Sequence, residues 1–182
     1  MADDFSRLVS LACHDLRTPL ATVQGFAKTM LRMEQLDDDK RIRYLGLIDN
    51  SADELAELLE LLSLAARIEG GRYDPVVREA DSLALAPDGA TGTGTTVRVD
   101  PEPVERALAA LQRAATRHGG VDVAVSVDGP RVALEPVVEG AAPVVLGESV
   151  KDLGAMVAVR LVRSLGGDVA LKGERLVITL PA

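Results

Sequence analysis

The chain has 182 residues, of which 47% are apolar but only 2% aromatic, so its core must consist mainly of leucine, valine and alanine. This length suffices for one large domain or two small ones. The formal net charge of −8 makes nucleic acid and anionic membrane surfaces poor partners. The single cysteine, Cys13, excludes an internal disulfide and favours a reducing compartment, so we expect a cytoplasmic protein. Asp3 and Asp4 do not fit a signal peptide, and no apolar run is long enough to predict a membrane span.

Apolar residues recur at three- and four-residue steps over residues 4–34, which predicts a first helix with one buried face. At about 100° per residue, His14 falls nearly opposite this apolar stripe, so we expect its ring in water, where neutral imidazole is a nucleophile. Asp15 can hold the second ring nitrogen, and Thr18 lies one turn further on the same strip. The stripe consists of Leu8, Ala12, Leu16, Leu20, Val23, Ala27 and Met30.

The run from His14 to Leu20, His-Asp-Leu-Arg-Thr-Pro-Leu, resembles the phosphoacceptor box of sensor histidine kinases, and its flanks are similar too. The resemblance implies that His14 accepts a phosphoryl group with Asp15 and Thr18 as catalytic neighbours. For Thr18, it also implies an alternative role, in which the hydroxyl positions a water for receiver dephosphorylation. Cys13, beside the histidine, is either a second nucleophile or, as we expect, simply a small helix residue.

A partner surface is expected along the same helix. Lys28 and Arg32 continue the His14 strip and Arg17 lies close to it, so these cations can meet the acidic surface of a receiver domain. Gly25 belongs to the part of the flank that resembles the kinase family. The alternative for the three cations is that they are merely solvated helix charges.

Residues 35–39 predict a connection in which one aspartate caps a second helix, and Gly70-Gly71 ends that helix. Two long helices joined by a short loop form an antiparallel hairpin. The apolar stripe of the second helix is too wide for one hairpin to cover, which predicts a homodimer through a four-helix bundle. Residues 58–71 also resemble the end of the dimerisation helix of the kinase family. The stripe comprises Leu45, Ile48, Ala52, Leu55, Leu59, Leu62 and Ala66.

From residue 72 onward, short valine-rich runs and turns predict an α/β sandwich with helices on one face of a largely antiparallel sheet. The expected fold class is therefore α+β, with domains 1–71 and 72–182. We expect the Gly/Thr-rich segment 90–96 to be a flexible surface loop, because no helix follows it as a phosphate cradle requires. The predicted helices are 101–117, which the run Asp100-Pro101-Glu102 caps, and 153–165. The predicted strands are 76–77 and 83–85 (both weak), 97–99, 121–127, 131–134, 169–171 and 176–180.

This second region resembles, more faintly, the ATP-binding domain of histidine kinases. Ala114 stands where the family holds magnesium through an asparagine, and alanine cannot ligate a hard cation. The glycine-rich phosphate segment retains only Gly154, with Asp152 at a glycine position, and the adenine-binding Asp-x-Gly-x-Gly loop is absent from the sequence before it. We therefore expect a degenerate domain and no cofactor or metal on this chain. The other histidine, His118, is expected only to favour the helix dipole at a helix end.

The leading hypothesis is a dimeric histidine phosphotransferase that shuttles a phosphoryl group between His14 and receiver-domain aspartates without using ATP. The receiver domain would supply the magnesium. Two alternatives stay open at this point. One is a divergent but active histidine autokinase, and the other is a non-catalytic scaffold that binds response regulators.

Overall fold

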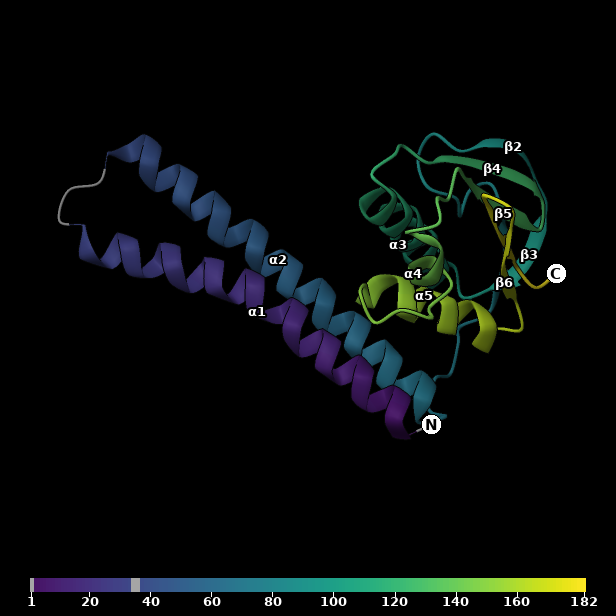
Figure 1. Ribbon diagram of the computed structural model, residues 1–182, viewed down its shortest axis with the longest axis horizontal. Coiled ribbons are helices and arrows are strands. Elements are labelled where there is room, and N and C mark those ends of the chain that lie inside the picture. The colour runs from purple at the N-terminus through teal and green to yellow at the C-terminus, as the bar shows by residue number, and fades with distance from the viewer. Residues whose placement is uncertain (1, 34–36) are drawn as a thin grey trace. The chain divides into compact units, whose positions relative to one another are not determined.

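The computed structural model describes residues 2–33 and 37–182, and the chain divides into two compact units, Met1–Ser63 and Leu64–Ala182. The first unit is helical and the second mixes helices with strands, so the expected α+β class is confirmed (Figure 1). Within the described part of the chain, no helix has the length and apolar character that crossing a membrane requires.

Helices α1 (Ala2–Arg32) and α2 (Asp38–Glu69) form the expected antiparallel hairpin, in which the Phe26 and Tyr44 rings pack with centroids 5.1 Å apart. Asp37 caps α2, since its Oδ1 accepts the N–H of Lys40 at 2.9 Å. Asp38 and Asp39, expected in the connection, form the first turn of α2 instead, and residues 34–36 of that connection lie outside the described residues. At the other end, Gly71 has φ +62°, and the Arg72 N–H donates to the Arg67 carbonyl at 2.8 Å. The glycine stop is therefore confirmed.

Burial along the hairpin is uneven. Leu8 and Ala12 are fully buried, as the stripe predicts. Leu20 was expected on the same buried face but is 45% exposed, and Leu45 and Leu59 of the second stripe are 50% and 55% exposed. One hairpin has too few facing side chains to cover both stripes, so a row of large apolar groups remains in water.

The second unit contains a five-stranded sheet in the order β2-β4-β5-β7-β6. Among its described strands β2 pairs with β4 in parallel and every other pair is antiparallel, which confirms the largely antiparallel sheet. Helices α3 (Pro101–Gly119) and α5 (Leu153–Ser164) lie on one side of it (Figure 1). The strands are β2 (Thr91–Gly94), β4 (Ala124–Gly129), β5 (Arg131–Glu135), β6 (Asp168–Lys172) and β7 (Arg175–Thr179).

Alternate residues of the central strands point toward α3 and α5 and form the aliphatic core that the composition requires. Examples are Val125, Val127, Val132, Leu134, Leu176 and Ile178, all at most 5% exposed. A short helix α4 (Ala142–Val145), which the sequence did not indicate, adds Val144 and Val145 to this core. A separate two-stranded sheet joins β1 (Arg78–Asp81) to β3 (Thr96–Val99).

Two weak strand predictions in the second unit are wrong. Residues 76–77 precede β1, which begins at Arg78, and residues 83–85 form a turn in which the Leu85 N–H donates to the Asp81 carbonyl. The start of α3 is as predicted, with Asp100 at the N-cap position and Glu102 in the first turn, although the Asp100 side chain makes no capping hydrogen bond.

The Gly/Thr-rich segment 90–96 is also not a loop, because it forms β2 and the first residue of β3. The fully buried Ser82 holds its end, donating from Oγ to the Gly129 carbonyl at 2.7 Å and accepting the Thr95 N–H at 2.9 Å. Gly92 has φ +120°, and an added Cβ there would overlap the Val127 carbonyl. Glycine is therefore required by close strand approach rather than by flexibility.

Candidate functional site

The ring of His14 lies on the outer face of α1. Its side chain is 77% exposed, so the exposure expected from the helical pattern is confirmed. The Nδ1 atom lies 3.1 Å from Oδ1 of Asp15, whose own side chain is only 26% exposed. A carboxylate at Nδ1 favours the tautomer that carries its proton there, which leaves the lone pair of Nε2 directed away from Asp15. The arrangement presents an oriented imidazole nucleophile at the surface.

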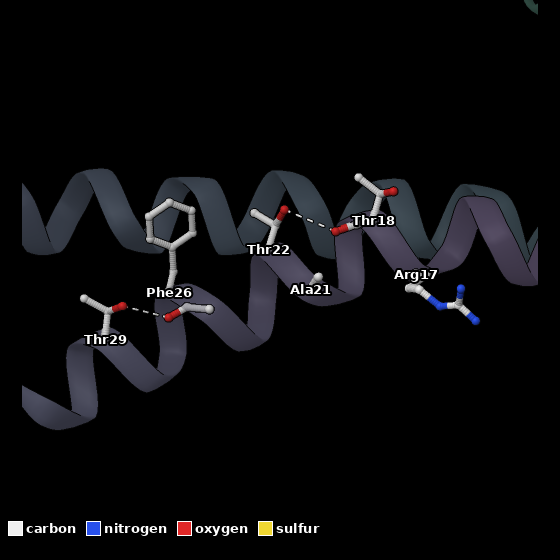
Figure 2. Close-up of a pocket in the computed structure, with 7 residues that line it drawn as sticks. Arg17, Thr18, Ala21, Thr22, Phe26 and Thr29 are labelled. Carbon is white, nitrogen blue, oxygen red and sulfur yellow. Dashed lines mark hydrogen bonds between the residues drawn. The ribbon is translucent and has the colours of Figure 1, made fainter.

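One face of α1, C-terminal to His14, lines an open hollow of about 590 Å³. Figure 2 shows the side chains that line it. Three residues predicted for the site line it, namely Arg17, Thr18 and Gly25. Lys28 and Arg32 are exposed on the same helix but do not line the hollow. The sequence analysis missed the remaining lining residues, although a four-residue step from Thr18 would have found several of them. They are Ala21, Thr22, Phe26 and Thr29.

The hollow presents a well-ordered helix surface rather than a loop. Thr22 Oγ1 donates to the Thr18 carbonyl at 3.2 Å, and Thr29 Oγ1 donates to the Gly25 carbonyl at 2.8 Å (Figure 2). Both hydroxyls are thereby turned onto the helix backbone. Apart from the adjoining helix backbone, no atom of the described residues 2–33 and 37–182 lies within 4 Å of the place where a Cβ on Gly25 would stand, so these residues do not require glycine there. The backbone at Gly25 is open to close approach by another molecule.

A second polar cluster joins α3 to α5 in the other unit. Asp152 caps α5, since its Oδ1 accepts the Ala155 N–H at 2.9 Å. Its Oδ2 lies 3.3 Å from Nε2 of His118 and 3.7 Å from Nη1 of Arg117. The sequence analysis gave His118 only a dipole role, because a partner 34 residues away gives no local signal. Ala114, which the sequence predicts to stand in place of a magnesium-binding asparagine, is 1% exposed on the buried face of α3.

The hairpin matches a known domain family. Residues 6–71 match the family model described as the His Kinase A (phospho-acceptor) domain. These residues form a phosphoacceptor domain of the His Kinase A type. The match includes His14, Asp15 and every residue that lines the hollow.

Two curated proteins are similar to part of the chain. The chain is 38% identical over 82 residues to the sensor protein kinase PmrB of Pseudomonas aeruginosa. It is 29% identical over 87 residues to an uncharacterized sensor-like histidine kinase of Rhizobium meliloti. Each match covers 45% of this chain but 17% of the relative, so the chain spans about a sixth of the length of either protein.

The likeness in structure extends beyond the phosphoacceptor domain. The histidine kinase AdeS of Acinetobacter baumannii superposes with a TM-score of 0.65 and 19% identity, covering 92% of this chain and 97% of that one. At this identity the match shows the fold alone, a helical hairpin followed by an α/β domain. The roles expected for individual site residues therefore stay predictions.

Proposed function

We propose that the chain is a histidine phosphotransferase of two-component signalling, which moves a phosphoryl group between His14 and receiver-domain aspartates without using ATP. The observation that carries the proposal is the exposed His14 ring, held through Nδ1 by Asp15 at 3.1 Å. Such an imidazole can react with a phosphoryl donor that another protein brings. The free Cys13 is compatible with a reducing compartment, and we propose the cytoplasm.

In the transfer, Nε2 of His14 attacks the phosphorus of an aspartyl phosphate on the receiver. The P–N bond forms as the P–O bond to the carboxylate breaks, and the receiver regains its free carboxylate. The ring becomes positively charged, and the Asp15 carboxylate at Nδ1 stabilises that charge. Delivery to a second receiver is the same step in reverse.

The hollow beside His14 supports a receiver domain as the partner. Arg17 at its edge and Lys28 and Arg32 beyond it favour an acidic surface, such as the cluster of carboxylates that holds magnesium in a receiver. The open backbone at Gly25 allows that surface to approach closely. The magnesium would belong to the receiver, and this chain would contribute the nucleophile and the docking surface.

The second unit supports a donor outside the chain, because its residues do not fit a magnesium nucleotide. The hydrocarbon side chain of Ala114 offers a cation no oxygen ligand, and it is buried. At the N-terminus of α5, where helix N–H groups would attract phosphates, the Asp152 carboxylate already accepts the Ala155 N–H. A triphosphate there would meet a fixed negative charge.

A homodimer is part of the proposal. Leu20, Leu45 and Leu59, all members of the predicted stripes, are 45–55% exposed on the single hairpin, and a second copy would cover them. Leu45→Glu should convert a dimer into a monomer, as measured by light scattering after size exclusion. Val150→Glu is the control, since Val150 is 44% exposed but lies in the other unit. A wild-type monomer would contradict this part of the proposal.

The transfer itself is tested by two labelling experiments. Purified receiver domains are charged with radiolabelled acetyl phosphate, freed of the reagent and mixed with the protein. We expect label on the wild-type chain and on His118→Gln, but none on His14→Gln. In parallel, radiolabelled ATP with magnesium should label neither the wild type nor the variants.

The same experiments separate the alternatives. The curated relatives are named as kinases, which favours an autokinase as the second candidate. Labelling of His14 from ATP would establish that alternative and refute ours. Binding of receivers without any transfer of label would leave only a scaffold.

A further inference from the structure

The division between the two units does not coincide with the end of α2. It falls between Ser63 and Leu64, eight residues before Gly71. Leu64 and Ile68 pack against the aliphatic core of the second unit. Arg160 of α5 also lies 3.1 Å from Glu69, with side chains only 15% and 26% exposed respectively. The last turns of α2 therefore pack as part of the second unit.

The segment that follows, residues 72–77, has no helix or strand, yet it is tied down at both ends. Both contacts are hydrogen bonds to Asp100. Its Oδ2 accepts the Tyr73 hydroxyl at 3.0 Å and the Val76 N–H at 3.2 Å. The Arg67 guanidinium lies over the Tyr73 ring, 5.9 Å from its centroid, which joins the end of α2 to the same group.

The Asp100 side chain makes these contacts instead of capping α3. It stands at the N-cap of α3, followed by Pro101, where an aspartate usually accepts a helix N–H. Here its side chain makes no cap and turns to residues 24 and 27 positions earlier in the chain. Asp100 thus stabilises the connection rather than the helix that it precedes.

We propose that residues 64–77 are a rigid extension of the C-terminal unit, held by Asp100, and that this unit therefore begins within α2 near Leu64 rather than in the segment after Gly71. The last turns of α2 then belong to the C-terminal unit, and residues 72–77 are not a flexible tether. A force or ligand that turns this unit turns the end of α2 with it. This inference does not depend on the proposed phosphotransfer.

The first test is hydrogen exchange at the Val76 amide, whose acceptor is Asp100 itself. Asp100→Asn keeps the size of the side chain but removes its charge, so exchange at Val76 should become roughly ten- to a hundredfold faster. The exposed Asp122→Asn is the matched control and should leave that rate unchanged. An unchanged rate at Val76 in Asp100→Asn would overturn the proposal.

A second measurement leaves Asp100 and Tyr73 unchanged. Tyr73 and Tyr44 are the only tyrosines of the chain, so Tyr44→Phe leaves a single phenol to follow by ultraviolet absorbance. Burial, and then the Asp100 carboxylate that accepts the hydroxyl, raise the pKa of Tyr73 above its ordinary value of 10.0. We expect the phenol to stay protonated past that pH while the unit is folded. Titration of the Tyr73 phenol at its ordinary pKa would show that the hydrogen bond to Asp100 is absent.

The start of the C-terminal unit has its own readout, namely the denaturant dependence of hydrogen exchange along α2. We expect the amides of residues 65–69 to lose protection together with those of α5, because they share one core. The amides of residues 40–62 should lose protection together with the rest of the hairpin. Loss of protection of residues 65–69 together with residues 40–62 would refute the assignment of residues 64–69 to the C-terminal unit.

Discussion

Replacing Asp152 by alanine should destabilise the C-terminal unit by about 2 kcal/mol, the sum of two contacts. Loss of the α5 cap on the Ala155 N–H costs ~1 kcal/mol. Loss of the hydrogen bond to His118, whose side chain is 21% exposed, costs about another 1 kcal/mol. Arg117 adds little, because it is 70% exposed and 3.7 Å away.

A conservative variant separates these two contributions. Asp152→Asn keeps an oxygen that can cap α5 but lacks the charge that faces His118, so we expect about half the loss. Unfolding in urea is followed by far-ultraviolet circular dichroism, and exchange of the Ala155 amide reports the cap directly. His118→Gln combined with Asp152→Ala completes a double-mutant cycle, in which the coupling energy should be about 1 kcal/mol.

The exposed Asp122→Ala serves as the control for Asp152→Ala. A difference between the two variants of less than about 0.5 kcal/mol would show that the cluster does not hold α3 to α5. A coupling energy near zero between His118 and Asp152 would have a narrower meaning. The cap would then act alone, and the 3.3 Å contact would contribute nothing.

Three further outcomes can be measured. Gly46→Ala should raise the stability of the hairpin by up to about 1 kcal/mol in thermal unfolding, since within the described part of the chain no atom beyond the adjoining helix backbone lies within 4 Å of an added Cβ. A loss of stability would reveal a close neighbour there. Gly92→Ala should cost roughly 2 kcal/mol or more in urea unfolding, because the new Cβ would overlap the Val127 carbonyl; a neutral change would mean that β2 can shift. The pKa of Tyr73 is raised in the folded unit, so the contribution of its phenol to folding stability is fully present below pH 10.0 and is lost as the pH rises through the folded pKa. Tyr73→Phe should abolish this alkaline loss of stability. An identical decline in the wild type and the variant would contradict the role given to Tyr73.

The hairpin could be predicted in detail because its information is local. Three- and four-residue apolar steps, an aspartate before α2 and two glycines after it fix both helices without reference to the rest of the chain. The exposure of His14 followed from the same periodicity. The boundary of the second unit could not be predicted from this periodicity, because Leu64 and Ile68 continue the apolar pattern of α2 while packing in the core of the second unit.

The second unit was less predictable where distant contacts override local preference. Residues 91–94, Thr-Gly-Thr-Gly, alternate strand-favouring threonine with glycine, which is depleted in strands, yet they form β2 because β4 lies alongside and glycine permits the close approach. Asp100 has the sequence context of a cap but finds stronger partners in Tyr73 and Val76. Only three of the residues that line the hollow on α1 were predicted, because others, such as Ala21 and Phe26, are apolar and carry no chemical signature of a site.

The packing of Leu64 and Ile68 bears on how this protein can be dissected or recombined. A cut after Gly71, at the visible end of the helix, removes two aliphatic side chains from the core they help to fill, together with the Glu69 partner of Arg160. The resulting fragment would carry a void and an exposed apolar strip, and we expect it to aggregate. A cut at Ser63 keeps the core intact, so a fragment of the C-terminal unit for fusion to other proteins should begin at Leu64 and include the last turns of α2.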